Sequence, residues 1–328
     1  MFPRDRFLIA TAFIAALTSQ FAPLGFAQTF PNKPIRILVP FVAGGSSDIV
    51  ARAIASKLPE SFPGVTVIVD NKPGANGSIA GEMLARAPAD GYTLLVGPTG
   101  MLAINPALYK NLPYQPLRDF DILTVAIRTA HMLVANPTFP SNTLAEFIAH
   151  LKKNPGKVSF ASSGTGSSDH LCAEIFWQQT GTTGIHVPYK GNAAAMTDLL
   201  GGTVDVAFLS VGATSSHVKD GRLKAITVAS AKRASQLPTV PTMAESGLAN
   251  FEVYAWQAVM APKGMPNDVL AKLHQAISAA LSATENRRRL DDMGYEVAAL
   301  SPAASADFLK AETARWQQVV NAGKITLD

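Results

Sequence analysis

The first third of the chain alternates between continuous apolar runs and runs in which apolar residues have helical spacing. The run Ile35–Val42 is almost entirely apolar, which is typical of a strand buried on both faces of a parallel sheet. After it, apolar side chains recur three or four positions apart, which predicts a helix that ends near Pro59. The same reasoning predicts strands at Val65–Val69 and Tyr92–Gly97, a helix at Ser78–Ala87, and irregular chain around Pro106, Pro113 and Pro116.

Farther along, two strand-like runs follow one another without a helix between them, Ile122–Ile127 and Met132–Ala135, and we expect the chain to cross there into a second lobe. A second series of helices and strands follows. It comprises a helix with Leu144, Phe147, Ile148 and Leu151, and strands at Val158–Ala161, His186–Tyr189, Asp205–Leu209 and Leu223–Val228. A strand-like return at Phe251–Met260 and helices at Val269–Leu281 and Ala303–Val320 complete the pattern, and the last helix is expected to pack on the first lobe.

This order predicts an α/β protein of two lobes joined by two crossings, with a ligand cleft between them. Lobe 1 is expected to comprise residues 28–127 and 252–328, and lobe 2 residues 128–251. Ligands of open α/β sheets bind beyond the C-terminal ends of the strands. The turns that follow the strands are therefore the first place to look for a site.

The N-terminal residues have the pattern of a secretory signal peptide. Arg4 and Arg6 precede the apolar stretch Phe7–Leu17, which is too short for a membrane span of about 20 residues. Small residues at Gly25 and Ala27 flank Phe26 as at a cleavage site, so residues 1–27 are the predicted signal peptide. We therefore expect a soluble periplasmic protein.

Composition narrows the class of protein further. The 328 residues are 48% hydrophobic and 16% charged, enough for well-filled cores. Basic residues are dispersed except for Arg287–Arg289, which lies late in a helical pattern where positive charge suits the helix dipole, and no nucleic-acid partner is expected. The single cysteine, Cys172, excludes an intramolecular disulfide and lies in a helical setting that indicates burial, so we expect a monomer.

One four-residue sequence occurs twice, at Gly45–Asp48 and at Gly166–Asp169, and each copy lies between a strand-like and a helix-like run. Such a turn presents unpaired backbone N–H groups at the positive end of a helix dipole, which suits an anion. Ordinary helix capping would also favour Ser and Asp there. The duplication, one copy in each lobe, favours two lobes that hold one small anion.

The sequence contains no local signature of catalysis or metal binding. Its six histidines form no His-x-x-x-His pair, and Cys-x-x-Cys, P-loop and nucleophile-elbow patterns are absent, so we predict no catalytic residues, no metal site and no cofactor. What remains is a hydroxyl-rich cleft able to bind a carboxylate through backbone N–H groups and Ser46, Ser47, Thr165, Ser167 and Ser168. Asp48 and Asp169 are expected to turn back onto the backbone of their own loops.

Several ordered motifs resemble the Bug-type, or TctC-like, extracytoplasmic solute receptors of tripartite tricarboxylate transporters. They are Val39–Gly45 with Asp48–Arg52, Asp70–Ala75, Ala89–Leu95, Asn105–Tyr109, Leu112–Tyr114, Val187–Gly191 and Pro238–Thr242. The resemblance covers essentially the whole mature chain. It implies the type II, Venus-flytrap fold of two-lobe periplasmic binding proteins. It also implies a carboxylate ligand that is held by the first βα loop of each lobe.

Carried over to this sequence, the resemblance implies a set of ligand-binding residues in those two loops and near the cleft. They are Phe41, Ala43, Gly44, Gly45, Ser46, Ser47 and Asp48 in the first loop, Ser162, Gly164, Thr165, Gly166, Ser167 and Ser168 in the second, and Thr99, Tyr189, Asp205 and Trp256 elsewhere. Ala43, Ser46-Ser47 and Trp256-Gln257-Ala258 depart from the usual family pattern, and they lie where specificity would be set.

The function expected from the sequence is capture of a small organic carboxylate and its delivery to the membrane subunits of a tripartite tricarboxylate transporter. Two alternatives stay open. The protein would instead present its ligand to a membrane signalling protein, or it would be a periplasmic hydrolase that uses a serine of these loops.

Overall fold

The computed structural model describes residues 30–326. The predicted signal peptide, residues 1–27, lies outside the described residues. The fold is formed by the compact unit that begins at Lys33. Within residues 30–326, no helix combines the length and the apolar character that crossing a membrane requires.

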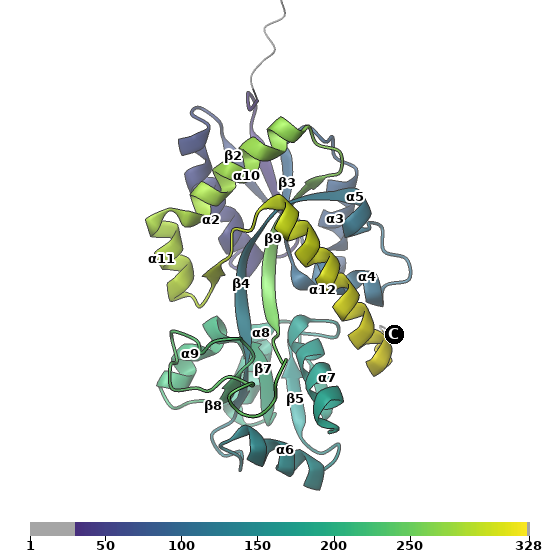
Figure 1. Cartoon of the computed structure of the whole chain (residues 1–328), viewed down its shortest axis with the longest axis vertical. Helices are drawn as coiled ribbons and strands as arrows, with labels where there is room; N and C mark the ends of the chain where they lie inside the picture. Colours follow the sequence, from purple (N-terminus) through teal and green to yellow (C-terminus); the bar gives the residue numbers. More distant parts are fainter. Residues whose placement is uncertain (1–29, 327–328) are drawn as a thin grey trace, which may run out of the picture. The chain divides into compact units, whose positions relative to one another are not determined.

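Lobe 1 is built on a sheet whose strands follow the order β2-β1-β3-β9-β4 (Figure 1). The strands are β1 (Ile35–Val39), β2 (Val67–Asn71), β3 (Thr93–Pro98), β9 (Tyr254–Pro262) and β4 (Phe120–Ala135), with the short β10 (Glu296–Val297) on β4. β1 pairs in parallel with β2 and β3, whereas β9 is antiparallel to β3 and β4. The helical elements are α2 (Ser46–Ser61), η2 (Ala75–Gly77), α3 (Ser78–Ala85), η3 (Gly100–Ile104), α4 (Asn105–Leu108), α5 (Pro116–Asp119), α10 (Asn267–Ser282), α11 (Thr284–Asp292) and α12 (Pro302–Gly323).

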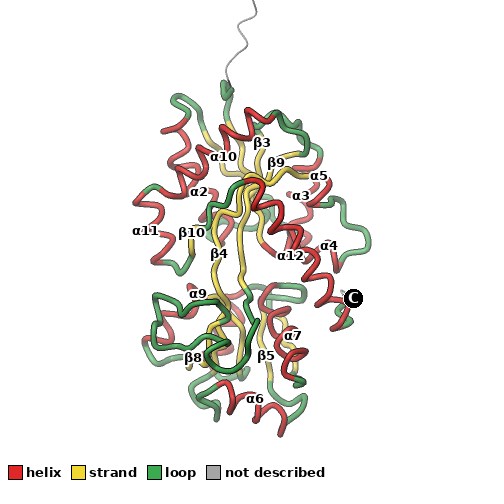
Figure 2. The backbone as a smooth tube through the Cα atoms, viewed as in Figure 1, coloured by secondary structure: helices red, strands yellow, loops and turns green. Residues whose placement is uncertain are grey.

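Lobe 2 continues the same sheet in the order β4-β7-β5-β6, with β8 also paired to β4. Its strands are β5 (Ser159–Ser162), β6 (Ile185–Pro188), β7 (Val206–Ser210) and β8 (Lys224–Val228). Its helices are α6 (Leu144–Lys153), α7 (Ser168–Thr180), α8 (Asn192–Gly201) and α9 (Val211–Lys219). Figure 2 shows how helices and loops surround these strands. The parallel β5, β6 and β7 bring the N-termini of the following helices to one edge of the sheet.

The two predicted strands at 122–127 and 132–135 are in fact one 16-residue strand, β4. β4 pairs with β9 as far as Ala130, opposite Tyr254, and from His131 onward it pairs with β7. The polar residues in the middle of β4 interrupt the apolar pattern but not the backbone hydrogen bonds. β4 and β9 therefore form the connection between the lobes, and the lobe limits expected from the sequence remain a prediction.

Prolines account for two further differences from the sequence prediction. The helix expected to end near Pro59 continues to Ser61, because a proline this close to the helix end removes only one backbone donor from the last turn. The segment expected to be irregular contains η3, α4 and α5, and both short α-helices carry a proline in their first positions, where its missing N–H costs nothing.

The C-terminal helix α12 contacts η3, α4 and β4 of lobe 1, as predicted, and also α7 of lobe 2. One hydrogen bond at this second contact joins Gln178 Nε2 to the carbonyl oxygen of Val319 at 3.3 Å. The predicted burial of Cys172 is confirmed, and it lies in an apolar cluster with residues of both lobes, among them Phe208 and Trp256.

Candidate ligand-binding site

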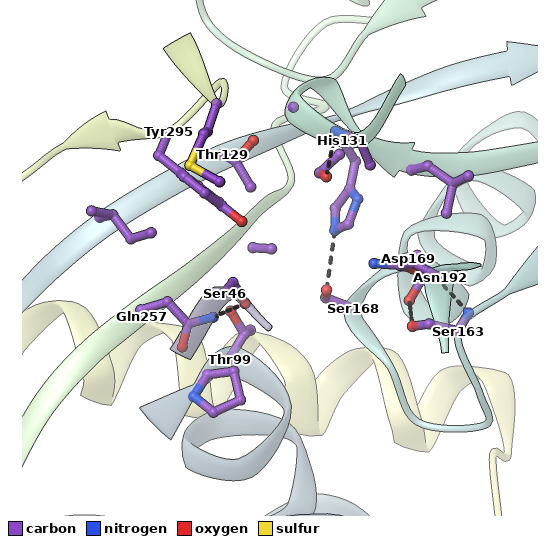
Figure 3. A pocket seen from close by; sticks show the side chains of 18 of the residues that line it. Ser46, Thr99, Thr129, His131, Ser163, Ser168, Asp169, Asn192, Gln257 and Tyr295 are labelled. Atoms are coloured by element: carbon purple, nitrogen blue, oxygen red, sulfur yellow. Dashed lines mark hydrogen bonds between the residues drawn. The ribbon is translucent and has the colours of Figure 1, made fainter. Parts of the chain in front are cut away.

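A cavity of about 560 Å³ lies between the lobes (Figure 3). From lobe 1 its wall is formed by the start of α2, the turn after β3, strands β4 and β9, and the chain after α11. From lobe 2 it is formed by the starts of α7, α8 and α9. Its lining is rich in hydroxyl groups, from Ser46, Thr99, Thr129, Ser163, Ser168, Ser210, Ser215, Ser216 and Tyr295.

Four helix N-termini meet at this cavity. Ser46 is the first residue of α2, Ser168 of α7 and Asn192 of α8, while Ser210 is the N-cap of α9. Among the described residues, no lysine or arginine lines the cavity. Backbone N–H groups and helix dipoles are therefore the principal sources of positive potential here, and they suit a small anion.

Asp48 rigidifies the first loop, as the sequence predicted. Its carboxylate accepts hydrogen bonds from Gly44 N (2.9 Å), Arg52 Nε (2.8 Å) and Asn71 Nδ2 (3.1 Å). Burial by itself would raise the pKa of Asp48, but the bonds from Arg52, Gly44 and Asn71 outweigh it and hold the pKa below its usual value. The charge of Asp48 is therefore satisfied by its own loop, by Arg52 of α2 and by Asn71 at the end of β2.

The second loop is held in the same way. Asp169 accepts hydrogen bonds from Ser163 N (2.6 Å) and Ser163 Oγ (2.8 Å). Ser167 is the helix N-cap: its Oγ accepts from His170 N (3.3 Å) and donates to the carbonyl oxygen of Gly164 (2.6 Å). Ser167 is thus committed to the turn, and Ser168, the next residue, faces the cavity (Figure 3).

Strand β4 contributes Ile127, Thr129 and His131 to the cavity wall, because alternate residues of a strand lie on one face. His131 Nε2 lies 3.1 Å from Ser168 Oγ. Burial lowers the pKa of His131 to about 4, against the opposing effect of Asp169, so the imidazole is neutral near pH 7. His131 therefore adds a hydrogen-bonding group and no charge to the cavity.

The lobe 1 wall carries a second polar group, formed by Ser46, Ser47, Gln257 and Tyr295. Gln257 Nε2 donates to Ser46 Oγ (2.9 Å), and Ser47 Oγ donates to Gln257 Oε1 (2.7 Å). Burial raises the pKa of the Tyr295 phenol, and the neighbouring Ser46 hydroxyl opposes that rise. Close by, Thr99 Oγ1 accepts from the backbone N–H of Trp256 at 2.8 Å.

Three of the residues predicted from the sequence line the cavity: Ser46, Thr99 and Ser168. Most of the others form the turns that carry these residues without lining the cavity themselves. They are Phe41, Ala43, Gly44, Gly45, Ser47 and Asp48 in the first loop and Ser162, Gly164, Thr165, Gly166 and Ser167 in the second.

The other three predicted residues have their side chains engaged elsewhere. The Tyr189 hydroxyl donates to Asp198 (2.6 Å), which raises the pKa of Tyr189 to about 12. Trp256 is buried, and its Nε1 donates to Glu312 (2.8 Å). Asp205 precedes β7, at the end of that strand away from Ser210, where it borders a separate cavity.

Sequence reasoning missed Asn192 and Ser210, although both follow a strand and begin a helix as the two Gly-Ser-Ser-Asp turns do. That local signal was present in the sequence. It also missed His131, Gln257 and Tyr295, which come together only through strand pairing and packing of the lobes. The alternation of Thr129 and His131 was the one pattern pointing to a polar strand face.

Comparison with known proteins agrees with this geometry. A family model described as tripartite tricarboxylate transporter family receptor matches residues 50–325. BugT of Bordetella pertussis (strain Tohama I) is 37% identical over 313 residues, which cover 95% of this chain and 94% of BugT. The structure of R. palustris Rpa4515 with adipate has a TM-score of 0.81 at 32% identity, covering 90% of this chain and 99% of that one. MatC from Rhodopseudomonas palustris with bound malate has a TM-score of 0.77 at 32% identity, covering 89% and 100%.

These likenesses extend over both lobes and confirm the two-lobe α/β fold of a periplasmic binding protein. The residues matched by the family model include the second loop, strands β4 and β9 and the starts of α7, α8 and α9. The chain therefore belongs to the receptors of the tripartite tricarboxylate transporter family, the TctC or Bug-type solute-binding proteins.

Proposed function

We propose that this protein captures a small organic carboxylate in the cavity between its lobes and delivers it to the membrane subunits of a tripartite tricarboxylate transporter. The observation that carries this proposal is the meeting of four helix N-termini around a hydroxyl-rich cavity whose described lining has no lysine or arginine. Such a site attracts an anion through N–H groups, without a fixed cation that would slow its release.

The relatives support the carboxylate. Two structures that share the fold over about nine-tenths of this chain hold adipate and malate. The signal-peptide pattern of residues 1–27 supports export to the periplasm. Closure of the lobes on the ligand would follow from contacts that form only when both lobes touch it.

The test is a thermal-shift and calorimetric screen of the mature protein against malate, succinate, adipate and glutamate, after partial unfolding to remove any ligand carried through purification. A carboxylate at 100 times its Kd adds about 2.7 kcal/mol to the stability of the folded state. For a chain of about 300 residues, whose unfolding entropy is about 2.1 cal/mol/K per residue, that corresponds to a rise in Tm of about 4 °C. A flat response to all four contradicts the proposal.

Ser168→Ala locates the site. It removes the hydroxyl at the start of α7 that faces the cavity, and we expect weaker binding with little change in Tm. Ser301→Ala is the matched control, because Ser301 caps α12 and does not line the cavity. Equal affinity of the Ser168 variant and the wild type would contradict this placement of the ligand.

Ser168 and His131 also resemble the nucleophile and base of a hydrolase, with Oγ and Nε2 3.1 Å apart. Two features disfavour that activity. His131 Nδ1 is buried and has no hydrogen-bond partner among the described residues, so no acidic side chain orients the ring. A pKa of about 4 also makes His131 a weak base at neutral pH. We expect no Ser168-dependent hydrolysis of p-nitrophenyl acetate.

The remaining alternative is presentation of the ligand to a signalling protein, and an uptake assay distinguishes it from delivery to a transporter. Uptake of the bound carboxylate into vesicles that contain the tripartite transporter's membrane subunits, dependent on this protein, supports delivery. Binding without stimulated uptake would favour the signalling role.

A further inference from the structure

Gln257 lies on strand β9 with its side chain on the cavity face, beside the start of α2 (Figure 3). The residue is 5% exposed. Two serines from another part of the chain hold both ends of its amide. Ser47 Oγ donates to Oε1 at 2.7 Å, and Nε2 donates to Ser46 Oγ at 2.9 Å. The amide therefore has a fixed orientation, with its nitrogen next to the Ser46 hydroxyl.

This arrangement leaves two protons for a ligand. The amide nitrogen has two N–H groups, of which one goes to Ser46. Ser46 accepts that bond, so its own proton is free to be donated to the Tyr295 phenol or into the cavity. If it goes to Tyr295, the phenol proton is released in its place. In either case one amide proton and one hydroxyl proton remain for a group in the cavity.

Both donors are neutral, and the α2 N-terminus lies directly beside them. A carboxylate has two acceptor oxygens and no donor, so it matches a pair of donors of this kind. We infer that Gln257 determines specificity at this site. Its free amide N–H and one hydroxyl proton, from either Ser46 or Tyr295, together bind one carboxylate group of the ligand. This inference rests on the proposed function.

A carboxamide is the analogue that this pair of donors rejects. Its NH₂ group would face a donor in place of an acceptor, and a buried donor left unpaired is unfavourable. If succinate binds, we expect the wild type to bind it at least tenfold more tightly than succinamide, which has no carboxylate left for this pair of donors.

Gln257→Glu tests the inference with little change in shape. The introduced carboxylate accepts hydrogen bonds from the hydroxyl groups of both serines, so the Ser46 hydroxyl no longer donates into the cavity. The negative charge also repels an anion. At pH 8 we expect affinity for malate, succinate, adipate or glutamate to fall at least 30-fold. Burial of the introduced group favours its protonated form, so at pH 5 part of the population becomes a donor again and the loss should shrink several-fold.

The readout is the ratio of variant to wild-type Kd at each pH, which cancels the titration of the ligand and of the groups that line the same cavity. Those groups are His131, Asp169, Asp292 and Tyr295. Gln257→Leu removes the amide donors without adding a charge. It should therefore weaken binding about tenfold at every pH. Gln317→Glu is the charge-matched control, since Gln317 is exposed on α12 and does not line the cavity.

The outcomes distinguish the two proposals. If the wild type binds a carboxylate and the Gln257→Glu variant binds it equally tightly from pH 5 to 8, the role of Gln257 is overturned. The proposed function then still stands. A loss of affinity without pH dependence overturns the donor role as well, because a merely structural residue would give that result. A wild type that binds none of the four carboxylates contradicts the proposed function and this inference with it.

Discussion

Gly212 and Gly294 bring the backbones of the two lobes into direct contact at the edge of the cavity. Gly212 lies in α9, and Gly294 follows α11. A Cβ added at Gly212 would overlap the carbonyl oxygen of Met293, and a Cβ added at Gly294 would lie 2.6 Å from Gly212 Cα. We predict that Gly212→Ala prevents the lobes from reaching this arrangement and so weakens ligand binding.

The size of the effect follows from what must move. The atoms in conflict belong to the backbone, so no side chain can swing away, and relief requires the lobes to part. Overpacking of this kind costs about 1–3 kcal/mol. Since about 1.4 kcal/mol is tenfold in Kd, we expect binding about 5- to 150-fold weaker. In the helix itself alanine is more favourable than glycine by about 0.5–1 kcal/mol, so the ligand-free protein should be at least as stable.

Calorimetry measures the Kd for a carboxylate that the wild type binds. Urea unfolding measures the stability of the ligand-free protein. Gly201→Ala is the matched control, because Gly201 is also helical, and the nearest atom to its added Cβ is Thr203 Oγ1 at 3.9 Å. A Gly212 variant that binds as tightly as the wild type would refute the reasoning. So would one that loses stability without ligand.

Three further predictions concern stability. Glu312→Leu removes the shared acceptor of the Trp256 and Trp316 indoles (2.8 and 3.1 Å), and leaving two buried donors unpaired should lower the free energy of unfolding by about 2 kcal/mol or more in urea. Ser167→Ala removes the α7 N-cap and should cost about 1 kcal/mol in the same assay, with ligand affinity changed less than twofold. Burial lowers the pKa of His131 from 6.5 to about 4. The contribution of its neutral ring to the free energy of unfolding is therefore complete above pH 6.5 and is lost as the pH falls toward 4, at up to about 1.4 kcal/mol per pH unit. His131→Gln should flatten this pH dependence in unfolding curves.

Each of these has an outcome that contradicts it. A Glu312 variant as stable as the wild type would show that the indole bonds contribute nothing. Tenfold weaker binding by the Ser167 variant would place that hydroxyl in the site itself. An unchanged slope between pH 6.5 and 4 in the His131 variant would assign the acid sensitivity to other groups, of which His186, with a pKa near 4, is the first candidate.

The sequence by itself determined the order of the elements, the chemistry of the two Gly-Ser-Ser-Asp turns and the family. Spacing of apolar residues, capping by Ser167 and the return of Asp48 onto Gly44 are local, because the interacting groups lie within a few residues of one another. Local patterns of this kind depend little on the rest of the chain. They are sufficient to place Ser46 and Ser168 at helix N-termini.

Only the tertiary structure decided which groups share the cavity. Gln257 meets Ser46 and Ser47 from 211 and 210 residues away, and His131 meets Ser168 across 37. The single strand β4 likewise depends on its pairing with β9 and β7, which apolar spacing cannot show. The physical reason is that strand pairing and lobe packing fix these positions through contacts distant in sequence, and no local preference of the residues themselves encodes the partner they will meet.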